Sequence, residues 1–462
     1  MLLDRTRAGA TRRLVLALAV AALLAFVVIP WWSGPHAVRV FTTSSSPRVA
    51  VYEPTPYHGE VFGALLAALQ AAGVNATFYA HRPDWDFAAV LADIHPAPPL
   101  APEALAAAIG RNEYDVVVLN TCDPKFQNRN HGVIAALEGS TARVVCQIHE
   151  GDFFGAAPED SAQLAPWLGR LDLLTLGAHT AKAVRRTLER FAQHTRSGAW
   201  ERVPVHHWAP VFDLPEAVVP AKVATGRFDK AAIIGRVWQT QRDYEGVMRE
   251  LEQAILENPG AWGYTVQGSP PRLVAADQPF TLHLIGMEGH HELTYPPLLV
   301  DEDSPVVHVH AGVSNVEYYR LIRGMVCRLS AAAADAQDIV LPAFNTEQYY
   351  DYKSSASVPA AIMCETPLLA TRRMLESYTY LQSPAYIPSP VGTSAVRALE
   401  QLRAGEAPWA AEFGAVPPPA VPPADAFLGA SRWPWAAGTS YARYTAALRA
   451  RNAEIFGDIM RA

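Results

Sequence analysis

Short apolar runs alternate with Ala- and Leu-rich stretches along most of the chain. The run RVAVYE (48–53) predicts a strand, GEVFGALLAALQAAG (59–73) predicts a helix that ends at Gly73, and VNATFYA (74–80) predicts the next strand. Further buried strands are predicted at YDVVVLNT (114–121), ARVVCQIHE (142–150) and LDLLTLGA (171–178). Strands that alternate with helices form a parallel sheet that helices cover on both faces.

The same pattern restarts after residue 225. It predicts strands at KAAIIGRV (230–237), FTLHLIGM (280–287) and DIVLPAF (338–344), with helices at YEGVMRELEQAILEN (244–258) and EYYRLIRGMVCRLSAA (317–332). We therefore expect an α/β protein with two doubly wound, Rossmann-like domains, at residues 47–220 and 221–400. Two such domains should face each other across a cleft, and sheets of this kind bind ligands at the carboxyl ends of their strands.

An apolar segment near the N-terminus belongs to neither domain. LVLALAVAALLAFVVIPWW (14–32) carries no charge, and as a helix it would span roughly 28 Å, close to the thickness of a bilayer core. Trp31 and Trp32 fall where an interfacial aromatic belt would lie. Basic residues precede the segment at Arg5, Arg7, Arg12 and Arg13. This charge distribution predicts a cytoplasmic N-terminus.

The predicted topology is a single-pass type II membrane protein of the Golgi or another secretory-pathway membrane. It has a cytoplasmic tail (1–13), a transmembrane signal anchor (14–32) and a stem (33–46), with the remainder in the lumen. A cleaved signal peptide is the alternative, although VVIPWWSGPHAV offers no good A-x-A cleavage site. In a lumen, Asn75 of the sequon Asn75-Ala76-Thr77 would be a glycosylation acceptor.

The composition limits the possible partners. The 462 residues are 50% hydrophobic, enough for two cores, and the net charge of -7 gives no electrostatic footprint for nucleic acid. The cysteines have no metal-binding spacing and are expected to be buried free thiols: Cys122, Cys146, Cys327 and Cys364. Residues 401–462 are expected to form a Pro- and Trp-rich arm and a terminal helix that packs back on the body.

Two histidines stand at predicted strand ends in the first domain. His58 precedes Gly59, which opens a helix and would let a ligand approach the backbone, and His149 closes the strand at 142–150. Both rings have a pKa suited to proton transfer and are candidate catalytic groups. The alternative for each is an exposed loop histidine.

The second domain offers candidate phosphate ligands. In IIGRVWQTQRD (233–243), Gly235 ends a strand, and Arg236 and Arg242 would direct guanidinium groups at the crevice, where a diphosphate would find bidentate donors. The stretch DYKSSASVPAAIMCETPLLA (351–370) joins a strand to a helix. Its hydroxyls at Ser354, Ser355 and Ser357 could contact a ligand at the helix N-terminus, or the stretch could be only a buried helix.

Three motifs have a spacing seen in metal sites, but no metal site is predicted. They are Asp84 with Asp86, Asp301 with Asp303, and His308 with His310. The aspartates lie in Pro-rich, surface-like settings, and the histidine pair has no obvious third ligand.

Taken in order, these pieces resemble a GT-B glycosyltransferase, most closely the retaining enzymes of glycosyltransferase family 4. The resemblance covers residues 47–380. It includes PYHGEVFG for the opening Gly-Gly loop, VCQIHE for the strand that ends in a histidine, VPVHHWAPVFD for the inter-domain link, IIGRVWQTQRD for the phosphate clamp and residues 340–370 for the donor-binding block. It implies that a nucleotide-sugar binds the C-terminal domain without a metal cofactor, and that a glycan or glycoconjugate acceptor binds the N-terminal domain.

The chain departs from that family at the donor site. The clamp lysine of the family aligns with Gln241, with Arg242 beside it as a possible substitute. Tyr352 and Ala360 stand where the family has its two glutamates, and Glu365 falls on a family glycine. The resemblance therefore implies a membrane-anchored, lumen-facing glycosyltransferase-like protein, with Tyr352 among its donor-binding residues. The alternatives are a catalytically inactive carbohydrate-binding or scaffold protein with this fold, and a secreted or cell-surface binding protein.

Overall fold

The computed structural model describes residues 46–462 except for 56–57, 81–86, 96, 123–129, 153–161, 163, 217–227, 237–239, 277, 287–292, 324–337 and 406–440. The predicted tail (1–13), the predicted anchor (14–32) and all but the last residue of the predicted stem (33–46) lie outside the described residues. None of the helices in the described part is both long enough and apolar enough to cross a membrane.

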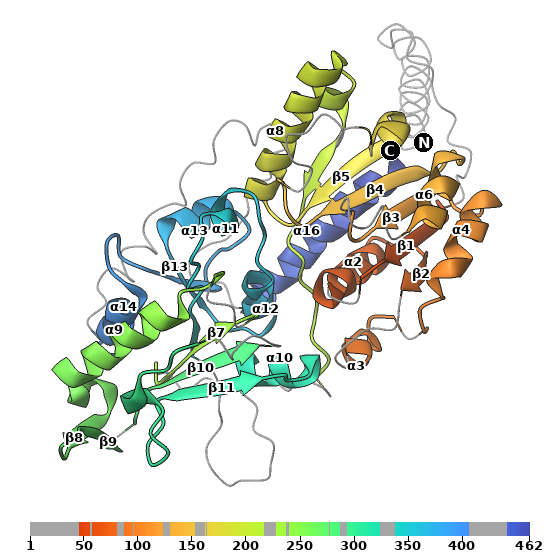
Figure 1. Cartoon of the computed structure of the whole chain (residues 1–462). Coiled ribbons are helices and arrows are strands. Elements are labelled where there is room, and N and C mark those ends of the chain that lie inside the picture. The colour runs from red at the N-terminus through yellow and green to blue at the C-terminus, as the bar shows by residue number, and fades with distance from the viewer. Residues whose placement is uncertain are drawn as a thin grey trace, which may run out of the picture. The chain divides into compact units, whose positions relative to one another are not determined.

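The N-terminal domain is built on a six-stranded sheet in which all neighbouring strands are parallel (Figure 1). In spatial order its strands are β2 (Ala76–Ala80), β1 (Val49–Glu53), β3 (Val116–Leu119), β4 (Arg143–Ile148), β5 (Leu171–Thr175) and β6 (Val205–His207). All five strands predicted from the apolar runs are present. The connection reverses direction between β1 and β3, and a ligand site of such a sheet lies at that point.

Both faces of this sheet are covered, because side chains alternate along each strand. In β1, Val49 and Val51 pack into one core, whereas Ala50 and Tyr52 pack into a second core on the opposite face. The first core is covered by α2 (Gly59–Ala71) and α3 (Phe87–Leu91). The second is covered by α4 (Pro102–Gly110), α6 (His131–Glu138), η1 (Ala165–Arg170), α8 (Ala178–Thr195) and η2 (Trp200–Arg202).

The C-terminal domain has a second parallel six-stranded sheet. Its spatial order is β11 (Val307–Ala311), β10 (Thr281–Gly286), β7 (Lys230–Ile234), β12 (Ile339–Val340), β13 (Leu368–Ala370) and β14 (Tyr386–Pro388). This order is that of a dinucleotide-binding sheet, with its reversal between β7 and β12. A two-stranded antiparallel ribbon, β8 (Tyr264–Gln267) with β9 (Arg272–Ala275), is added beside it.

Helices cover both faces of the second sheet as well. One face is covered by α9 (Tyr244–Glu257), η3 (Pro259–Trp262) and α14 (Ala395–Arg403). The other face is covered by α10 (Asn315–Arg323), α12 (Ser357–Met363) and α13 (Arg372–Ser377). The connecting segments contain two further short elements, η5 (Pro297–Leu299) and α11 (Gln348–Asp351). Asp243 caps α9, because its side chain accepts a hydrogen bond from the amide of Gly246 at 3.0 Å. Two parallel Rossmann-like domains in sequence are the architecture that the GT-B resemblance implies, so this part of the prediction is confirmed.

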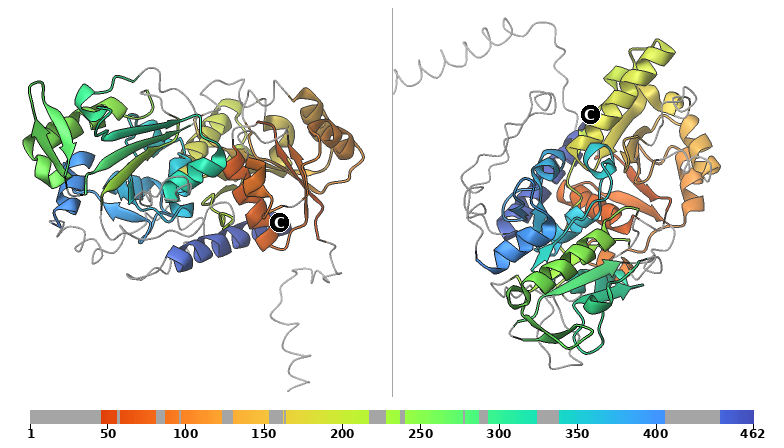
Figure 2. Two further views of the ribbon diagram at one scale, coloured as in Figure 1. Left: turned by 90° about the horizontal axis from the view of Figure 1, so that it is seen from below. Right: turned by 60° about the vertical axis from the view of Figure 1, so that its left-hand side comes forward.

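The last helix, α16 (Tyr441–Arg461), contacts both domains. Its Tyr444 hydroxyl donates to the carbonyl of Tyr380 at 2.7 Å, and its Asn452 amide donates to the carbonyl of Ala209 at 2.6 Å. The helix packs against α2, and both views in Figure 2 show it alongside the domains. The predicted terminal helix that packs back on the body is therefore present, whereas the arm before it lies outside the described residues.

The expectation of free thiols is wrong for two cysteines. Cys122 follows β3 and Cys146 lies in the neighbouring β4, and the two form a disulfide with 5.4 Å between their Cα atoms. Parallel pairing brings together residues that are 24 positions apart in the sequence, and no sequence motif signals this contact. Cys364 is a buried free thiol as expected, and Cys327 lies outside the described residues.

Candidate functional site

The two predicted histidines meet at the carboxyl ends of the strands of the first sheet. His58 is the residue before α2, and His149 follows β4. Their rings are stacked with 3.9 Å between centroids. The Nε2 atom of His149 donates to the carbonyl of Asn120 at 2.7 Å, so in the neutral ring Nδ1 is the basic nitrogen. Burial, with the positive charges of Arg236 and Lys353 and the ring of His149, lowers the pKa of His58 well below its usual range.

A carboxylate that the sequence analysis did not single out lies beside this pair. Glu53 is the last residue of β1 and is only 4% exposed. It accepts hydrogen bonds from the Asn120 amide, from Thr55 and from Thr121, whose hydroxyl is also 3.5 Å from Nε2 of His149. Burial raises the pKa of Glu53 to about 7, although these hydrogen bonds act in the opposite direction. A polar residue that ends an otherwise apolar strand was the available signal.

Cationic side chains from the second domain extend the site. Gly235 and Arg236 directly follow β7, at the reversal point of the second sheet. Arg236 and Lys353 both lie close enough to His58 to lower its pKa. The Lys353 ammonium is 3.5 Å from the carboxylate of Glu150 and lies over the ring of Tyr349. The structure therefore brings positive charge from the second domain to the histidine pair of the first.

Arg242 is buried, with an exposure of only 4%. Its guanidinium donates to the carbonyl of Pro342, to Ser355 Oγ at 3.2 Å and to Ser357 Oγ at 2.6 Å. It also lies 5.0 Å from the centroid of the Phe344 ring. No carboxylate among the described residues pairs with it. A buried cation without a counter-charge is unfavourable, so this guanidinium is suited to an anionic ligand.

Gly235 and Gly59, the two glycines predicted to bind the donor, have no side chain for different structural reasons. Gly235 has a φ of 120°, and a Cβ there would lie 3.2 Å from a guanidinium nitrogen of Arg242. A side chain at this position would therefore be strained and would crowd the buried cation. A Cβ at Gly59 would lie 2.9 Å from the ring of Phe87, so Gly59 is explained by packing. A donor-binding role for either glycine remains a prediction.

The serine-rich stretch is both a buried helix and an inter-domain turn. Ser355 is buried and its hydroxyl supports Arg242, whereas the Ser354 hydroxyl is 2.8 Å from that of Thr180 in the first domain. The carbonyl of Tyr352 accepts a hydrogen bond from the amide of Gly151 at 2.6 Å. Their roles in donor binding remain predictions.

Glu365 occupies a backbone conformation that favours glycine. Its φ is 55°, just after α12, and its carboxylate pairs with Arg323 at 2.8 Å. A glycine would adopt this conformation more readily than a glutamate does. Ala360 lies inside the buried helix α12, and its methyl group offers no hydrogen bond.

The pairs with a spacing seen in metal sites make the following contacts where the structure describes them. Asp301 and Asp303 lie near the guanidinium of Arg272, at 4.0 Å and 3.7 Å. His308 and His310 stack with His283 of the neighbouring strand, with centroids 4.9 Å and 5.2 Å apart. No group of three or more His, Cys, Asp or Glu among the described residues could hold a metal ion. Asp84 and Asp86 lie outside the described residues.

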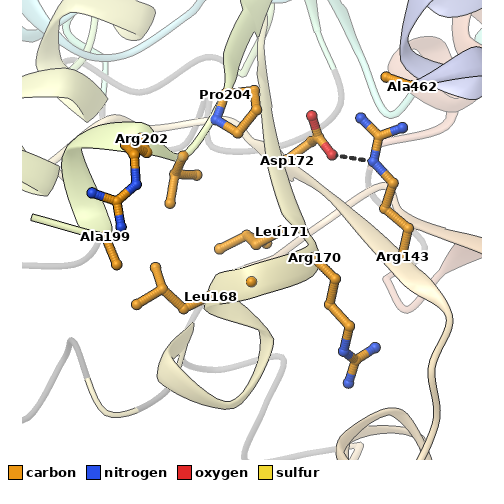
Figure 3. Close-up of a pocket in the computed structure, with 11 residues that line it drawn as sticks. Arg143, Leu168, Arg170, Leu171, Asp172, Ala199, Arg202, Pro204 and Ala462 are labelled. Carbon is orange, nitrogen blue, oxygen red and sulfur yellow. Dashed lines mark hydrogen bonds and ion pairs between the residues drawn. The ribbon is translucent and has the colours of Figure 1, made fainter. Parts of the chain in front are cut away.

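Two further features lie at the opposite, amino-terminal edge of the first sheet. Asn75, the predicted glycosylation acceptor, is exposed just before β2. A pocket of about 550 Å³ lies beside the first residues of β4 and β5 (Figure 3). In it Arg143 is directed at Asp172, and Arg202 lies across the pocket. None of the predicted site residues lines this pocket, which separates it from the histidine pair.

The comparisons with known proteins find distant matches among solved structures. No protein-family model and no curated protein matches the chain. Among solved structures, the Anabaena protein HepE in complex with UDP-glucose is 11% identical, over 89% of this chain and 100% of that chain, with a TM-score of 0.46. A glycosyltransferase from Rickettsia africae is 10% identical, over 90% of this chain and 96% of that chain, with a TM-score of 0.46.

A UDP-forming α,α-trehalose-phosphate synthase from Burkholderia xenovorans is 11% identical, over 90% of this chain and 99% of that chain, with a TM-score of 0.44. Similarity of this degree carries no argument about the chemistry of this chain, and it does not confirm membership of glycosyltransferase family 4.

Proposed function

We propose that this chain transfers a sugar from a nucleotide-sugar donor to a glycan or glycoconjugate. The observation that carries the proposal is the buried guanidinium of Arg242, which has no carboxylate partner among the described residues. A donor diphosphate would supply the missing negative charge and would accept charge-assisted hydrogen bonds. Gly235, which has no side chain, avoids crowding that cation.

Arg236 and Lys353 would complete the diphosphate site. Both act electrostatically on His58, so an anion bound among these cations would also lie near the histidine pair. Their charges would stabilise the nucleotide diphosphate as it leaves the sugar. We therefore propose a transfer that needs no metal cofactor.

The acceptor would bind on the side of the first domain, near His149. In the transfer, the bond between the anomeric carbon and the diphosphate oxygen breaks, and a bond to an acceptor hydroxyl oxygen forms. The hydroxyl proton goes to a base, for which Nδ1 of His149 is suited because the Asn120 carbonyl holds the proton of the neutral ring on Nε2. Glu53 would position this group through Thr121.

We propose that the protein is anchored by residues 14–32 and faces the lumen of a secretory-pathway membrane, with Asn75 open to glycosylation. The apolar composition of the anchor segment supports this location. The disulfide between Cys122 and Cys146 gives independent support, because disulfides persist in oxidising compartments and are rare in the cytosol.

A second candidate function is carbohydrate binding without catalysis. This function is favoured by Tyr352 and Ala360. They stand where glycosyltransferase family 4, which this chain resembles, has the two glutamates that contact the donor. An alanine methyl group cannot accept a hydrogen bond from a ribose or sugar hydroxyl. Glycan binding without nucleotide binding would identify this function.

The test is incubation of the full chain, purified in detergent, with a panel of sugar nucleotides. Release of nucleoside diphosphate or transfer to an acceptor, together with a thermal shift, supports the proposal. Arg249→Ala provides a matched control for substitutions at Arg236, since Arg249 is an exposed arginine on α9. If no donor gives either release of nucleoside diphosphate or a thermal shift, the proposal is overturned.

A further inference from the structure

A short joint connects the two Rossmann-like domains directly beside the histidine pair. On the side of the second domain it consists of residues 352–354. The amide of Gly151 donates to the carbonyl of Tyr352 at 2.6 Å, and the amide of Ser354 donates to the carbonyl of His149 at 3.3 Å. The turn that carries Lys353 is therefore attached through its backbone to the loop that carries His149.

His179, in the first turn of α8, lies at the centre of this joint. It is 7% exposed. Its Nε2 is 3.1 Å from the carbonyl oxygen of Lys353, and its Nδ1 is 2.8 Å from that of Ser377. Its ring lies 4.6 Å from the ring of Tyr378. One buried side chain of the first domain thus contacts two separate carbonyl groups of the second.

These contacts make specific demands on the side chain at position 179. A peptide carbonyl only accepts hydrogen bonds, so each ring nitrogen of His179 must donate in order to bond its carbonyl. A neutral imidazole donates from one nitrogen at a time. The contacts to Lys353 and Ser377 can therefore be separated by substitutions that keep a donor at one of the two places.

The position of Lys353 links the joint to the site. The carbonyl of Lys353 faces His179, while its ammonium is 3.5 Å from Glu150 and acts on His58. A shift of this backbone would move both the ammonium and the attachment to the His149 loop. Neighbouring Thr180 adds a contact, since its hydroxyl is 2.8 Å from that of Ser354.

We propose that His179, in the tautomer that donates from Nε2, is a positioning residue that holds the Lys353 carbonyl and thereby sets the diphosphate-binding cations against the histidine pair. The role of a diphosphate ligand in this inference rests on the proposed function. The hydrogen bonds of the joint can be measured without any ligand. His179 is not expected to contact the substrate. Its effect should pass through Lys353.

The experiment compares four variants of the full chain in detergent. His179→Phe keeps an aromatic ring beside Tyr378 and removes both ring nitrogens. His179→Gln restores a donor near the place of Nε2, and His179→Asn restores one near the place of Nδ1. His194→Phe, at an exposed position in the last turn of the same helix, is the control. The measurements are hydrogen exchange at the amides of Gly151 and Ser354, and the affinity for inorganic pyrophosphate.

We expect His179→Phe to accelerate exchange at both amides and to weaken pyrophosphate binding, each by about tenfold, as loss of a buried hydrogen bond predicts. His179→Gln should recover more of both properties than His179→Asn, and His194→Phe should leave both unchanged. Unaltered exchange in His179→Phe, or better recovery with Asn than with Gln, would overturn the inference. If His179→Phe does not fold, the comparison of His179→Gln with His179→Asn carries the test. Equal exchange in these two variants is then the contrary result.

The two proposals fail in different ways. If the wild type binds no pyrophosphate while the exchange results are as expected, the proposed diphosphate site is wrong and the joint stands. If pyrophosphate binds but the His179 variants bind it as tightly as the wild type, the proposed function survives and the positioning role is wrong.

Discussion

The stacked rings of His58 and His149, 3.9 Å apart, join two loops that follow different strands of the first sheet. The contact places one imidazole with a strongly lowered pKa against another whose Nε2 is held by a carbonyl. The positive charges of Arg236 and Lys353 from the second domain act on His58. An anionic donor and a proton-accepting group are thereby brought within reach of each other.

Replacement of His149 by Phe should separate binding from chemistry. Phenylalanine keeps a ring to stack on His58 but cannot accept a proton. We expect the rate of sugar transfer to fall by about 10² to 10⁴, the usual contribution of a general base, while donor affinity stays within about threefold. Steady-state kinetics with His131→Phe, an exposed position in α6, provide the control. Full activity in His149→Phe would remove this residue from the reaction.

Replacement of Arg236 by Ala should weaken binding of a nucleoside diphosphate. Loss of a charge-assisted donor predicts about 1.5 to 3 kcal/mol in binding free energy. Titration calorimetry measures this directly. Arg249→Ala, on the solvent side of α9, should bind as the wild type does. Equal affinities in the two variants would place Arg236 outside the site.

Stability should depend on pH through Glu60 in the first turn of α2. Burial raises its pKa to about 7 in the folded state, from 4.5. The folded state therefore binds more protons than the unfolded chain between these values, and stability falls as the pH rises through that range. Above pH 7 the buried charge should destabilise the protein by at most about 3 kcal/mol.

Glu60→Gln removes this charge, so it should be more stable than the wild type at pH 8 and nearly equal to it near pH 4.5. Urea unfolding at the two pH values measures the difference. Glu103→Gln, at an exposed glutamate in the first turn of α4, is the control. A Glu60→Gln variant that is less stable than the wild type at pH 8 would contradict the sign.

The disulfide should contribute to stability. Cys122 and Cys146 are buried and close a loop over 24 positions, so their replacement by Ser should lower the unfolding free energy by about 2 to 4 kcal/mol. A reductant should destabilise the wild type by a similar amount and leave the double variant unchanged. The chain has four cysteines, so the unfolded wild type without reductant should have two reactive thiols if the disulfide forms. Four reactive thiols would show that the bond does not form.

The central strands could be predicted from the sequence because strands buried on both faces read as continuous apolar runs, as in VVVL of β3. Strands β6, β8, β9, β13 and β14 were not predicted. Of these, β6, β13 and β14 have only three residues each, and β14 ends in Pro388, so they give no clear pattern. The predicted helix at 317–332 is described as α10 only as far as Arg323.

The candidate site was predicted only in part. His58, His149 and Gly235 follow strands, and a rule about strand ends finds them. Glu53 also ends a strand, but it was missed because its hydrogen-bond partners Asn120 and Thr121 come from another strand end. Arg242 is buried by contacts with Pro342, Ser355 and Ser357. These residues lie at least 100 positions away in the sequence, so only the folded chain shows the contacts.

The proposed function is tested most directly at Arg242, by the thermal shift that nucleoside diphosphates produce in the wild type and in Arg242→Met. Methionine retains an apolar stem in the buried position and has no charge. The proposal predicts that at least one nucleoside diphosphate raises the unfolding temperature of the wild type and that this shift is lost in the folded variant. An equal shift in both proteins, or no shift in the wild type with any nucleotide, would contradict it.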